Sequence, residues 1–118
     1  MKTGIDVVEI ARFNNIDIEK FMNRFCCNNE IEYIKTKTNK AQTLAGIYAC
    51  KEAVLKAFKI GIGNKLSLKK VEIFHDNGVP YLNINKSIEK LLKINNAKEV
   101  DVNISHSENI AIAICIIL

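Results

Sequence analysis

A carboxylate and an ammonium group lie four residues apart near the middle of the chain, at Glu52 and Lys56. Residues 48–58 are otherwise mostly apolar, so we expect a buried helix in which ionised groups need a partner or a ligand. Both side chains fall on one helical face, and Gly61 and Gly63 follow where the helix should end. A carboxylate holds hard cations and free backbone N–H groups cradle phosphate, so this pattern suits a metal ion bridged to a phosphate.

Each of these residues also has a simpler structural explanation. Glu four residues before Lys stabilises helices in general, so Glu52 and Lys56 could form an ordinary ion pair, although this leaves the glycines unexplained. The two glycines are as consistent with a plain helix end as with a phosphate cradle. Asp6 lies among β-branched residues and fits an exposed position on a strand, whereas His106 lies between two serines and fits an ordinary loop.

The composition is that of an ordinary soluble globular protein, with 118 residues of which 48% are apolar and 25% are charged. We expect one domain over residues 1–118, with no internal repeat or linker. The start lacks a basic leader with an apolar core, and no apolar run reaches the roughly 18 residues of a membrane span. We therefore expect a cytoplasmic protein that binds no membrane, with its four cysteines reduced and used for packing.

The net charge of +4 is a mild excess, and its distribution is more informative than its size. From Lys51 to Lys70 six lysines accompany a single acid, Glu52, which predicts a positive field over this part of the chain. Solvated loops are the simpler explanation for Lys65, Lys69 and Lys70. The chain has no aromatic-rich stacking strand and no Arg-rich helix, which argues against a nucleic-acid-binding domain.

Periodicity and capping signals predict the elements that position these residues. The predicted strands cover residues 5–10, 71–74, 79–84, 99–104 and 109–117, and the predicted helices cover residues 18–25, 30–37, 41–59 and 86–95. Asp17 and Asn85 are the expected N-caps of two helices, Asn28 or Asn29 caps another, and Asp76-Asn77-Gly78 is a hairpin turn. This order of elements is typical of an α+β fold with an antiparallel sheet and a long buried central helix.

Four ordered segments of the chain resemble one family. They are residues 4–12 (GIDVVEIAR), 51–57 (KEAVLKA), 77–80 (NGVP) and 104–107 (ISHS), the last followed by an apolar strand that contains alanine. In this order and spacing they resemble the holo-[acyl-carrier-protein] synthases, the small bacterial type of 4'-phosphopantetheinyl transferase. The resemblance covers nearly the whole chain, and four ordered segments are a far more specific signal than any one alone.

The resemblance implies transfer of 4'-phosphopantetheine from coenzyme A to a serine of apo-acyl carrier protein, a step of fatty acid biosynthesis that releases adenosine 3',5'-bisphosphate. It implies that Asp6 and Glu52 bind Mg²⁺ and that Lys56 contacts phosphate, and these three residues form the expected catalytic group. Two carboxylates suffice for Mg²⁺, because water and substrate phosphate fill its other positions. Either Glu52 or a metal-bound water would accept the serine proton. The expected coenzyme A-binding residues are Lys56, Gly61, Gly63, Gly78, Pro80 and His106.

The resemblance also implies that basic residues of the helix at 18–25 dock the acidic carrier protein. Lys20 and Arg24 lie four residues apart on its polar face, and Arg12 follows the first strand, so all three could face one acidic surface. Phe25 would add an apolar contact beside Arg24. A solvated helix face is the alternative, because Glu19 lies nearby.

Family members assemble as homotrimers with active sites at subunit interfaces, and we expect the same here. The even-numbered isoleucines at positions 110–116 share one face of the last strand, and the odd-numbered residues 111–117 share the other. Both faces are apolar, so we expect one to meet the helices and the other to meet a second subunit.

Two positions depart from the pattern of the family. Ile47-Tyr48 stands where relatives commonly have Arg-Phe, and Lys59 stands where a glycine is usual. Lys59, or a lysine within residues 65–70, could supply the charge of that arginine. The alternative function is a non-catalytic module that binds coenzyme A or another nucleotide. The carboxylates of Asp6 and Glu52 argue against it, since binding an anion needs no additional acid.

Overall fold

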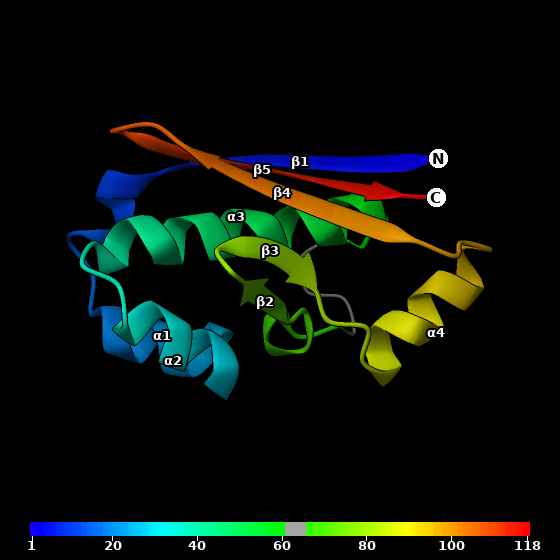
Figure 1. Ribbon diagram of the computed structural model, residues 1–118, viewed down its shortest axis with the longest axis horizontal. Helices are drawn as coiled ribbons and strands as arrows, with labels where there is room; N and C mark the ends of the chain where they lie inside the picture. Colours follow the sequence, from blue (N-terminus) through cyan, green and yellow to red (C-terminus); the bar gives the residue numbers. More distant parts are fainter. Residues whose placement is uncertain (61–65) are drawn as a thin grey trace.

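The computed structural model of the chain describes residues 1–60 and 66–118, in which a small sheet lies on one long helix and shorter elements pack beside it (Figure 1). The first half contains β1 (Lys2–Glu9), the 3₁₀ turn η1 (Ile10–Phe13), α1 (Ile18–Phe25), α2 (Asn28–Lys35) and α3 (Lys40–Ala57). The second half contains the 3₁₀ turn η2 (Leu68–Lys70), β2 (Ile73–Asp76), β3 (Val79–Leu82), α4 (Lys86–Ile94), β4 (Val100–His106) and β5 (Ile110–Ile117).

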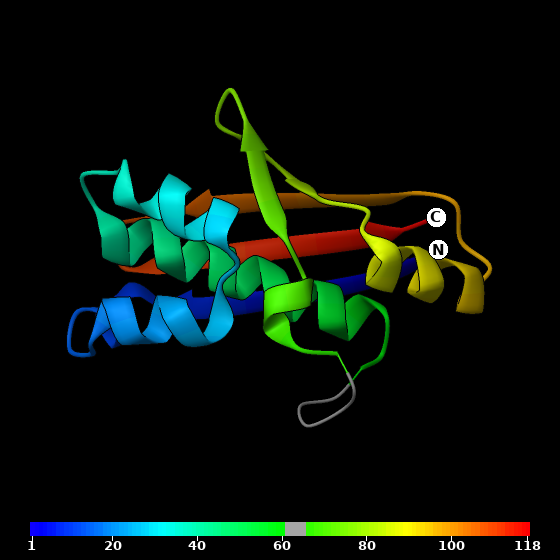
Figure 2. The same ribbon diagram turned by 90° about the horizontal axis from the view of Figure 1, so that it is seen from below.

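The main sheet has the strand order β1-β5-β4, and both of its pairings are antiparallel. The C-terminal strand β5 is therefore central, with Ala113 opposite Asp6 on one side and opposite Ile104 on the other. A second, two-stranded sheet is the hairpin β2–β3. Figure 2 shows the molecule from below, with α3 lying across one face of the main sheet. The hairpin extends beside β4 and away from β1. The predicted α+β fold with an antiparallel sheet is confirmed.

A glycine in β1 allows this strand to lie directly on α3. A Cβ atom added at Gly4 would collide with the carbonyl oxygen of Ala53 and lie 2.6 Å from the backbone nitrogen of Ala57. On α3, Ala49, Ala53 and Ala57 are themselves fully buried, so small residues on both elements permit the close approach. This contact sets the distance between α3 and Asp6, which follows Gly4 by two residues on the same face of β1.

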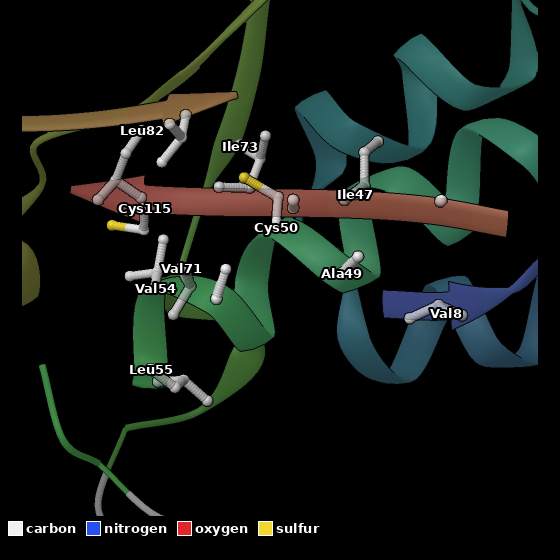
Figure 3. Close-up of a cluster of buried hydrophobic side chains, with 14 of the residues drawn as sticks. Val8, Ile47, Ala49, Cys50, Val54, Leu55, Val71, Ile73, Leu82 and Cys115 are labelled. Atoms are coloured by element: carbon white, nitrogen blue, oxygen red, sulfur yellow. The ribbon is translucent and has the colours of Figure 1, made fainter. Parts of the chain in front are cut away.

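The core lies between α3, the inner face of the main sheet and the start of the hairpin (Figure 3). Val54 of α3, Val71 and Ile73 are each no more than 1% exposed, and Cys115 of β5 is fully buried. Burying an aliphatic side chain of this size contributes roughly 1.5–3 kcal/mol before entropy is counted. All four cysteines carry free thiols, and burial raises the pKa of Cys26 to about 12, as expected for packing residues.

The two faces of the main sheet differ. Ala111, Ala113, Cys115 and Ile117 of β5 point toward α3 and are at most 2% exposed. On the outer face Ile5 and Val7 are each 55% exposed and Ile114 is 38% exposed. The expectation that helices cover one face of the last strand is therefore correct, and its other face is open in the single chain.

Several element boundaries differ from the sequence-based expectation. The first strand begins at Lys2 instead of Ile5, because Lys2 already pairs with Ile117. The second helix begins at Asn28, after Cys27, instead of at Glu30. The central helix ends at Ala57, and Lys59 adopts a positive φ of 60°.

The predicted N-caps of α1 and α4 are confirmed. The Asp17 side chain accepts a hydrogen bond from the backbone N–H of Lys20 at 3.1 Å, and the Asn85 side chain accepts one from Ile88 at 3.0 Å. The hairpin turn at Gly78, with φ of 80°, also lies where the sequence predicts it. None of the helices in residues 1–60 and 66–118 has the length and apolarity needed to cross a membrane.

Candidate functional site

Asp6, Glu52 and Lys56 meet where β1 crosses α3. Asp6 is on the helix-facing side of β1, and its Oδ1 atom lies 2.9 Å from Nζ of Lys56. The same ammonium donates to the carbonyl oxygen of Ile5 at 3.1 Å. Lys56 thus pairs with an acid on the sheet, instead of forming the ordinary helical pair with Glu52, and the structure brings the three predicted catalytic residues together.

The electrostatics of Glu52 depend on its four neighbours at this site. Burial raises the pKa of Glu52, and the nearby carboxylate of Asp6 raises it further. A hydrogen bond from Tyr48 and the positive charges of Lys56 and Arg12 lower the same pKa. Two carboxylates therefore face each other at the edge of a partly desolvated surface, and a cation between them would remove their repulsion.

The donors at this place fit a hard divalent cation that keeps much of its water. Among the residues that the structure describes, no cluster of three or more His, Cys, Asp or Glu side chains could enclose a metal ion. Mg²⁺ does not require such a cage, because it is commonly held by one or two carboxylates together with water and substrate phosphate. Asp6 and Glu52 supply two such carboxylates.

The expectation that Glu52 and Lys56 lie in a buried environment is wrong for Lys56. Its side chain is 54% exposed, whereas that of Asp6 is 16% exposed and Glu52 is half-buried. The buried lysine of α3 is Lys51, which is 1% exposed and paired with Glu30. Lys51 therefore adds no charge to a surface, and the predicted positive field does not include it.

An aromatic cluster joins the site to α1. The ring of Tyr48 packs edge to face against Phe13, Phe21 and Phe25, with centroid distances of 5.8, 5.5 and 6.5 Å. The guanidinium of Arg12 lies over the Tyr48 ring, 5.2 Å from its centroid. Arg12, predicted to contact a partner, is thus also a neighbour of Glu52.

The other predicted partner-binding residues line a shallow groove along α1. Lys20, Arg24 and Phe25 lie along it together with Ile16, Asp17 and Phe21. The Arg24 guanidinium stacks over the Phe25 ring at 5.1 Å from the centroid. The groove combines two cations with an exposed apolar surface, and it borders the aromatic cluster beside Glu52.

The remaining predicted cofactor-binding residues lie elsewhere in the chain. Gly78 and Pro80 belong to the hairpin, and His106 is the last residue of β4 instead of a loop residue. Its ring packs against α3, since a Cβ atom at Gly46 would lie 2.6 Å from Nε2 of His106. Strand β5 separates β4 from β1, which places them roughly 10 Å apart. One chain therefore does not bring His106 and the hairpin to Asp6, and Gly61 and Gly63 lie outside the described residues.

Sequence reasoning missed three contributors to this arrangement. Tyr48 precedes Glu52 by one helical turn, and this spacing was available as a signal. Gly4 and Gly46 carry no chemistry, and only the packing of strands on α3 reveals why each must lack a side chain.

Comparison with known sequences identifies the family of this chain. A sequence model of the 4'-phosphopantetheinyl transferase superfamily matches residues 2–115. A holo-[acyl-carrier-protein] synthase of Finegoldia magna is 35% identical over 119 residues, which cover 100% of this chain and 96% of the relative. One from Caldicellulosiruptor saccharolyticus is 41% identical over 118 residues, with 96% and 92% of the two chains covered.

Solved structures agree with the sequence comparison. The holo-[acyl-carrier-protein] synthase of Helicobacter pylori in complex with coenzyme A superposes with a TM-score of 0.83 at 32% identity, covering 98% of this chain and 99% of that one. The Bacillus anthracis synthase, in complex with coenzyme A (3',5'-ADP), gives a TM-score of 0.80 at 30% identity, covering 98% and 94%. The chain therefore belongs to the 4'-phosphopantetheinyl transferase superfamily and, within it, to the holo-[acyl-carrier-protein] synthases. It is an enzyme of that family.

Proposed function

We propose that this chain transfers 4'-phosphopantetheine from coenzyme A to a serine of an apo-acyl carrier protein, in the service of fatty acid biosynthesis. The single observation that carries the proposal is the convergence of Asp6, Glu52 and Lys56 at one edge of a chain that belongs to this family. The coenzyme A in the Helicobacter pylori relative supports the choice of donor substrate.

Asp6 and Glu52 would hold Mg²⁺ in this proposal. When bound there, Mg²⁺ would offset the negative charge that builds on the pyrophosphate during transfer. The two carboxylates repel each other in its absence, which is one cause of the raised pKa of Glu52. Lys56 pairs with Asp6 in the ligand-free chain, and its half-exposed ammonium can turn toward an incoming phosphate.

Proton removal from the carrier serine has two candidate acceptors, the carboxylate of Glu52 and a water molecule held beside it. Glu52 is half-buried beside Asp6 at the place where the proposed phosphate would bind, so its carboxylate is within the site at which the serine would react. The hydroxyl of Tyr48 acts against burial and the charge of Asp6 and lowers the pKa of Glu52.

A homotrimer would complete the site from two chains. Within one chain Asp6, Glu52 and Lys56 lie at the β1 edge, whereas the hairpin, with Gly78 and Pro80, and His106 lie at the β4 side. The apolar outer face of the sheet, with Ile5 and Val7 each 55% exposed, is the surface we assign to the subunit contact. A neighbouring copy would then place its hairpin and His106 against the partly buried carboxylates of Asp6 and Glu52.

The carrier protein would dock on α1, along the groove lined by Lys20, Arg24 and Phe25. The groove is next to the aromatic cluster, so a docked carrier would lie close to Glu52. We place the reaction in the cytoplasm, consistent with four free thiols, since reducing compartments keep cysteines unpaired.

A direct assay tests this function. The protein would be incubated with apo-acyl carrier protein, coenzyme A and Mg²⁺, and the carrier weighed by mass spectrometry. We expect a mass increase of one phosphopantetheine, which disappears when Mg²⁺ is chelated. A chain that binds coenzyme A but leaves the carrier unmodified would instead be the non-catalytic binding module.

A further inference from the structure

A buried ion pair unused by the proposed chemistry lies on a different face of α3 from the candidate site. Nζ of Lys51 is 2.7 Å from Oε1 of Glu30, and both side chains are at most 1% exposed. Lys51 directly precedes Glu52 in the sequence, and consecutive helical residues point about 100° apart. One turn of α3 therefore carries a proposed metal ligand toward the site and an ammonium toward the interior.

Every hydrogen-bonding position of this ammonium is filled. Besides Glu30, Nζ of Lys51 donates to the carbonyl oxygens of Leu68 at 2.8 Å and Val71 at 2.7 Å. A lysine ammonium has three N–H donors, and here it has three acceptors. Two of these acceptors are main-chain atoms at the start and end of one short segment, the turn η2 and the residue after it.

Both carboxylate oxygens of Glu30 likewise accept hydrogen bonds. Its Oε1 also accepts from the backbone N–H of Cys27 at 2.8 Å, and its Oε2 accepts from the backbone N–H of Ile73 at 2.8 Å. Ile73 is the first residue of the hairpin strand β2. The pair thus connects α2 and α3 to the main chain of residues 68–73, and its other hydrogen bonds go to backbone atoms.

We propose that Lys51 and Glu30 are positioning residues for coenzyme A binding. By fixing residues 68–73 against α3, the pair sets where the hairpin presents Gly78 and Pro80. This inference rests on the proposed function, in which the hairpin contacts coenzyme A. The hairpin leaves the pair at Ile73 and reaches its turn after only three further strand residues, so a displacement at its start moves its tip.

The arrangement differs from an ordinary stabilising ion pair. Buried ion pairs commonly add little net stability, because desolvation offsets their attraction. Their best supported use is to select one geometry among alternatives, and a pair bonded to four main-chain groups is well suited to this. Before β2 begins, residues 68–72 contain only one short 3₁₀ turn, so their course depends on hydrogen bonds to other parts of the chain, including those to this pair.

Amide hydrogen exchange of the ligand-free protein tests the structural half of the proposal. In Lys51→Met we expect exchange in a peptide spanning residues 66–76 to accelerate by roughly tenfold or more, while β1 and β5 peptides stay near their normal rates. Glu30→Gln gives a second, milder variant that keeps an acceptor for a backbone N–H, and it carries the test if Lys51→Met fails to fold. Ile117→Ala, a buried change in β5, is the control for general destabilisation.

Steady-state kinetics test the functional half. We expect Lys51→Met or Glu30→Gln to raise the KM for coenzyme A by roughly tenfold, with kcat at saturation and the KM for carrier protein within about threefold of the unmodified values. Equal acceleration of exchange in all peptides, or an equal KM change in Ile117→Ala, would overturn the proposal. If the unmodified protein transfers nothing, the proposed function fails, whereas the exchange experiment still decides whether the pair anchors the hairpin.

Discussion

Arg12 lies over the ring of Tyr48, with its guanidinium carbon 5.2 Å from the ring centroid, and both side chains lower the pKa of Glu52. The arginine that the sequence assigns to partner binding is thus connected to the candidate metal ligand through one aromatic ring. Arg24 on α1 stacks on Phe25, so it reaches Tyr48 only through a second aromatic ring. The two arginines should therefore affect the reaction differently.

Reversal of the charge at Arg24 should weaken carrier docking alone. We expect Arg24→Glu to raise the KM for carrier protein on the order of tenfold and to reduce its salt dependence, while the KM for coenzyme A is unchanged. Arg12→Gln should lower kcat as well, because it removes a positive charge beside Glu52. Lys93→Glu, the same reversal on an exposed side chain of α4, is the control. Both KM values rising together in Arg24→Glu would contradict a docking role for α1.

Removal of the charge at Glu52 should abolish most turnover without unfolding the chain. Glu52→Gln keeps the shape of a half-buried side chain but loses a metal ligand, so we expect kcat/KM to fall by roughly 10²-fold or more with little change in Tm. Glu89→Gln on α4 is the matched control, since Glu89 is an exposed acid that pairs with Lys93 at 3.7 Å. Near-normal turnover of Glu52→Gln at limiting Mg²⁺ would remove Glu52 from the metal site.

A charge introduced on one face of β5 should prevent folding, whereas a charge on the other face should prevent only assembly. Ala113 is 2% exposed and faces α3, so Ala113→Asp buries an unpaired charge, and we expect the chain not to fold. Ile112 lies on the outer face, so Ile112→Asp should give a folded but inactive monomer. Sedimentation and circular dichroism measure the two outcomes. An active monomer of the unmodified protein would exclude the trimeric site.

His75 should make stability depend on pH. Its ring stacks on Tyr33 at 3.9 Å, and its Nδ1 has no hydrogen-bond partner among the residues that the structure describes. Burial, aided by the charge of Lys37, lowers its pKa from 6.5 to about 4. Because the folded pKa is below the unfolded one, its contribution is complete above pH 6.5 and declines as pH falls toward 4. After allowance for its partial exposure we expect a loss of about 1–2 kcal/mol.

Denaturant unfolding at pH 7 and at pH 4.5 measures this loss. His75→Phe keeps an aromatic ring against Tyr33 and cannot be protonated, so we expect it to lose less stability on acidification than the unmodified chain. Equal losses in the two proteins would show that His75 is not the group responsible.

The sequence predicts best those features that depend on neighbouring residues. The caps at Asp17 and Asn85 are local bonds between a side chain and a backbone N–H three residues ahead, so the residue types alone indicate them. The meeting of Asp6 with Lys56 is not local, and only the resemblance of two separate segments to one family indicates it. The tertiary contact through Gly4 explains why these segments come together.

Features that depend on distant partners were not predictable in the same way. Lysine is rarely buried, and the acid that compensates Lys51 is 21 residues away in another helix, so nothing near Lys51 marks it as an interior residue. His106 reads as a loop residue between two serines, yet strand pairing with Ala111 places it in β4. The expected positions of Lys51 and His106 were wrong because contacts with distant helices and strands determine them, and local composition does not reveal these contacts.

The separation of the candidate site across β5 has a consequence for mixed assemblies. If each site combines the β1 edge of one chain with the β4 side of another, two inactive variants damaged at opposite edges can repair each other. In trimers reassembled from equal amounts of Glu52→Gln and His106→Ala chains, about one quarter of the sites would inherit both intact halves. Activity would then return on mixing two preparations that are each inactive alone, as in complementation between two alleles of one gene.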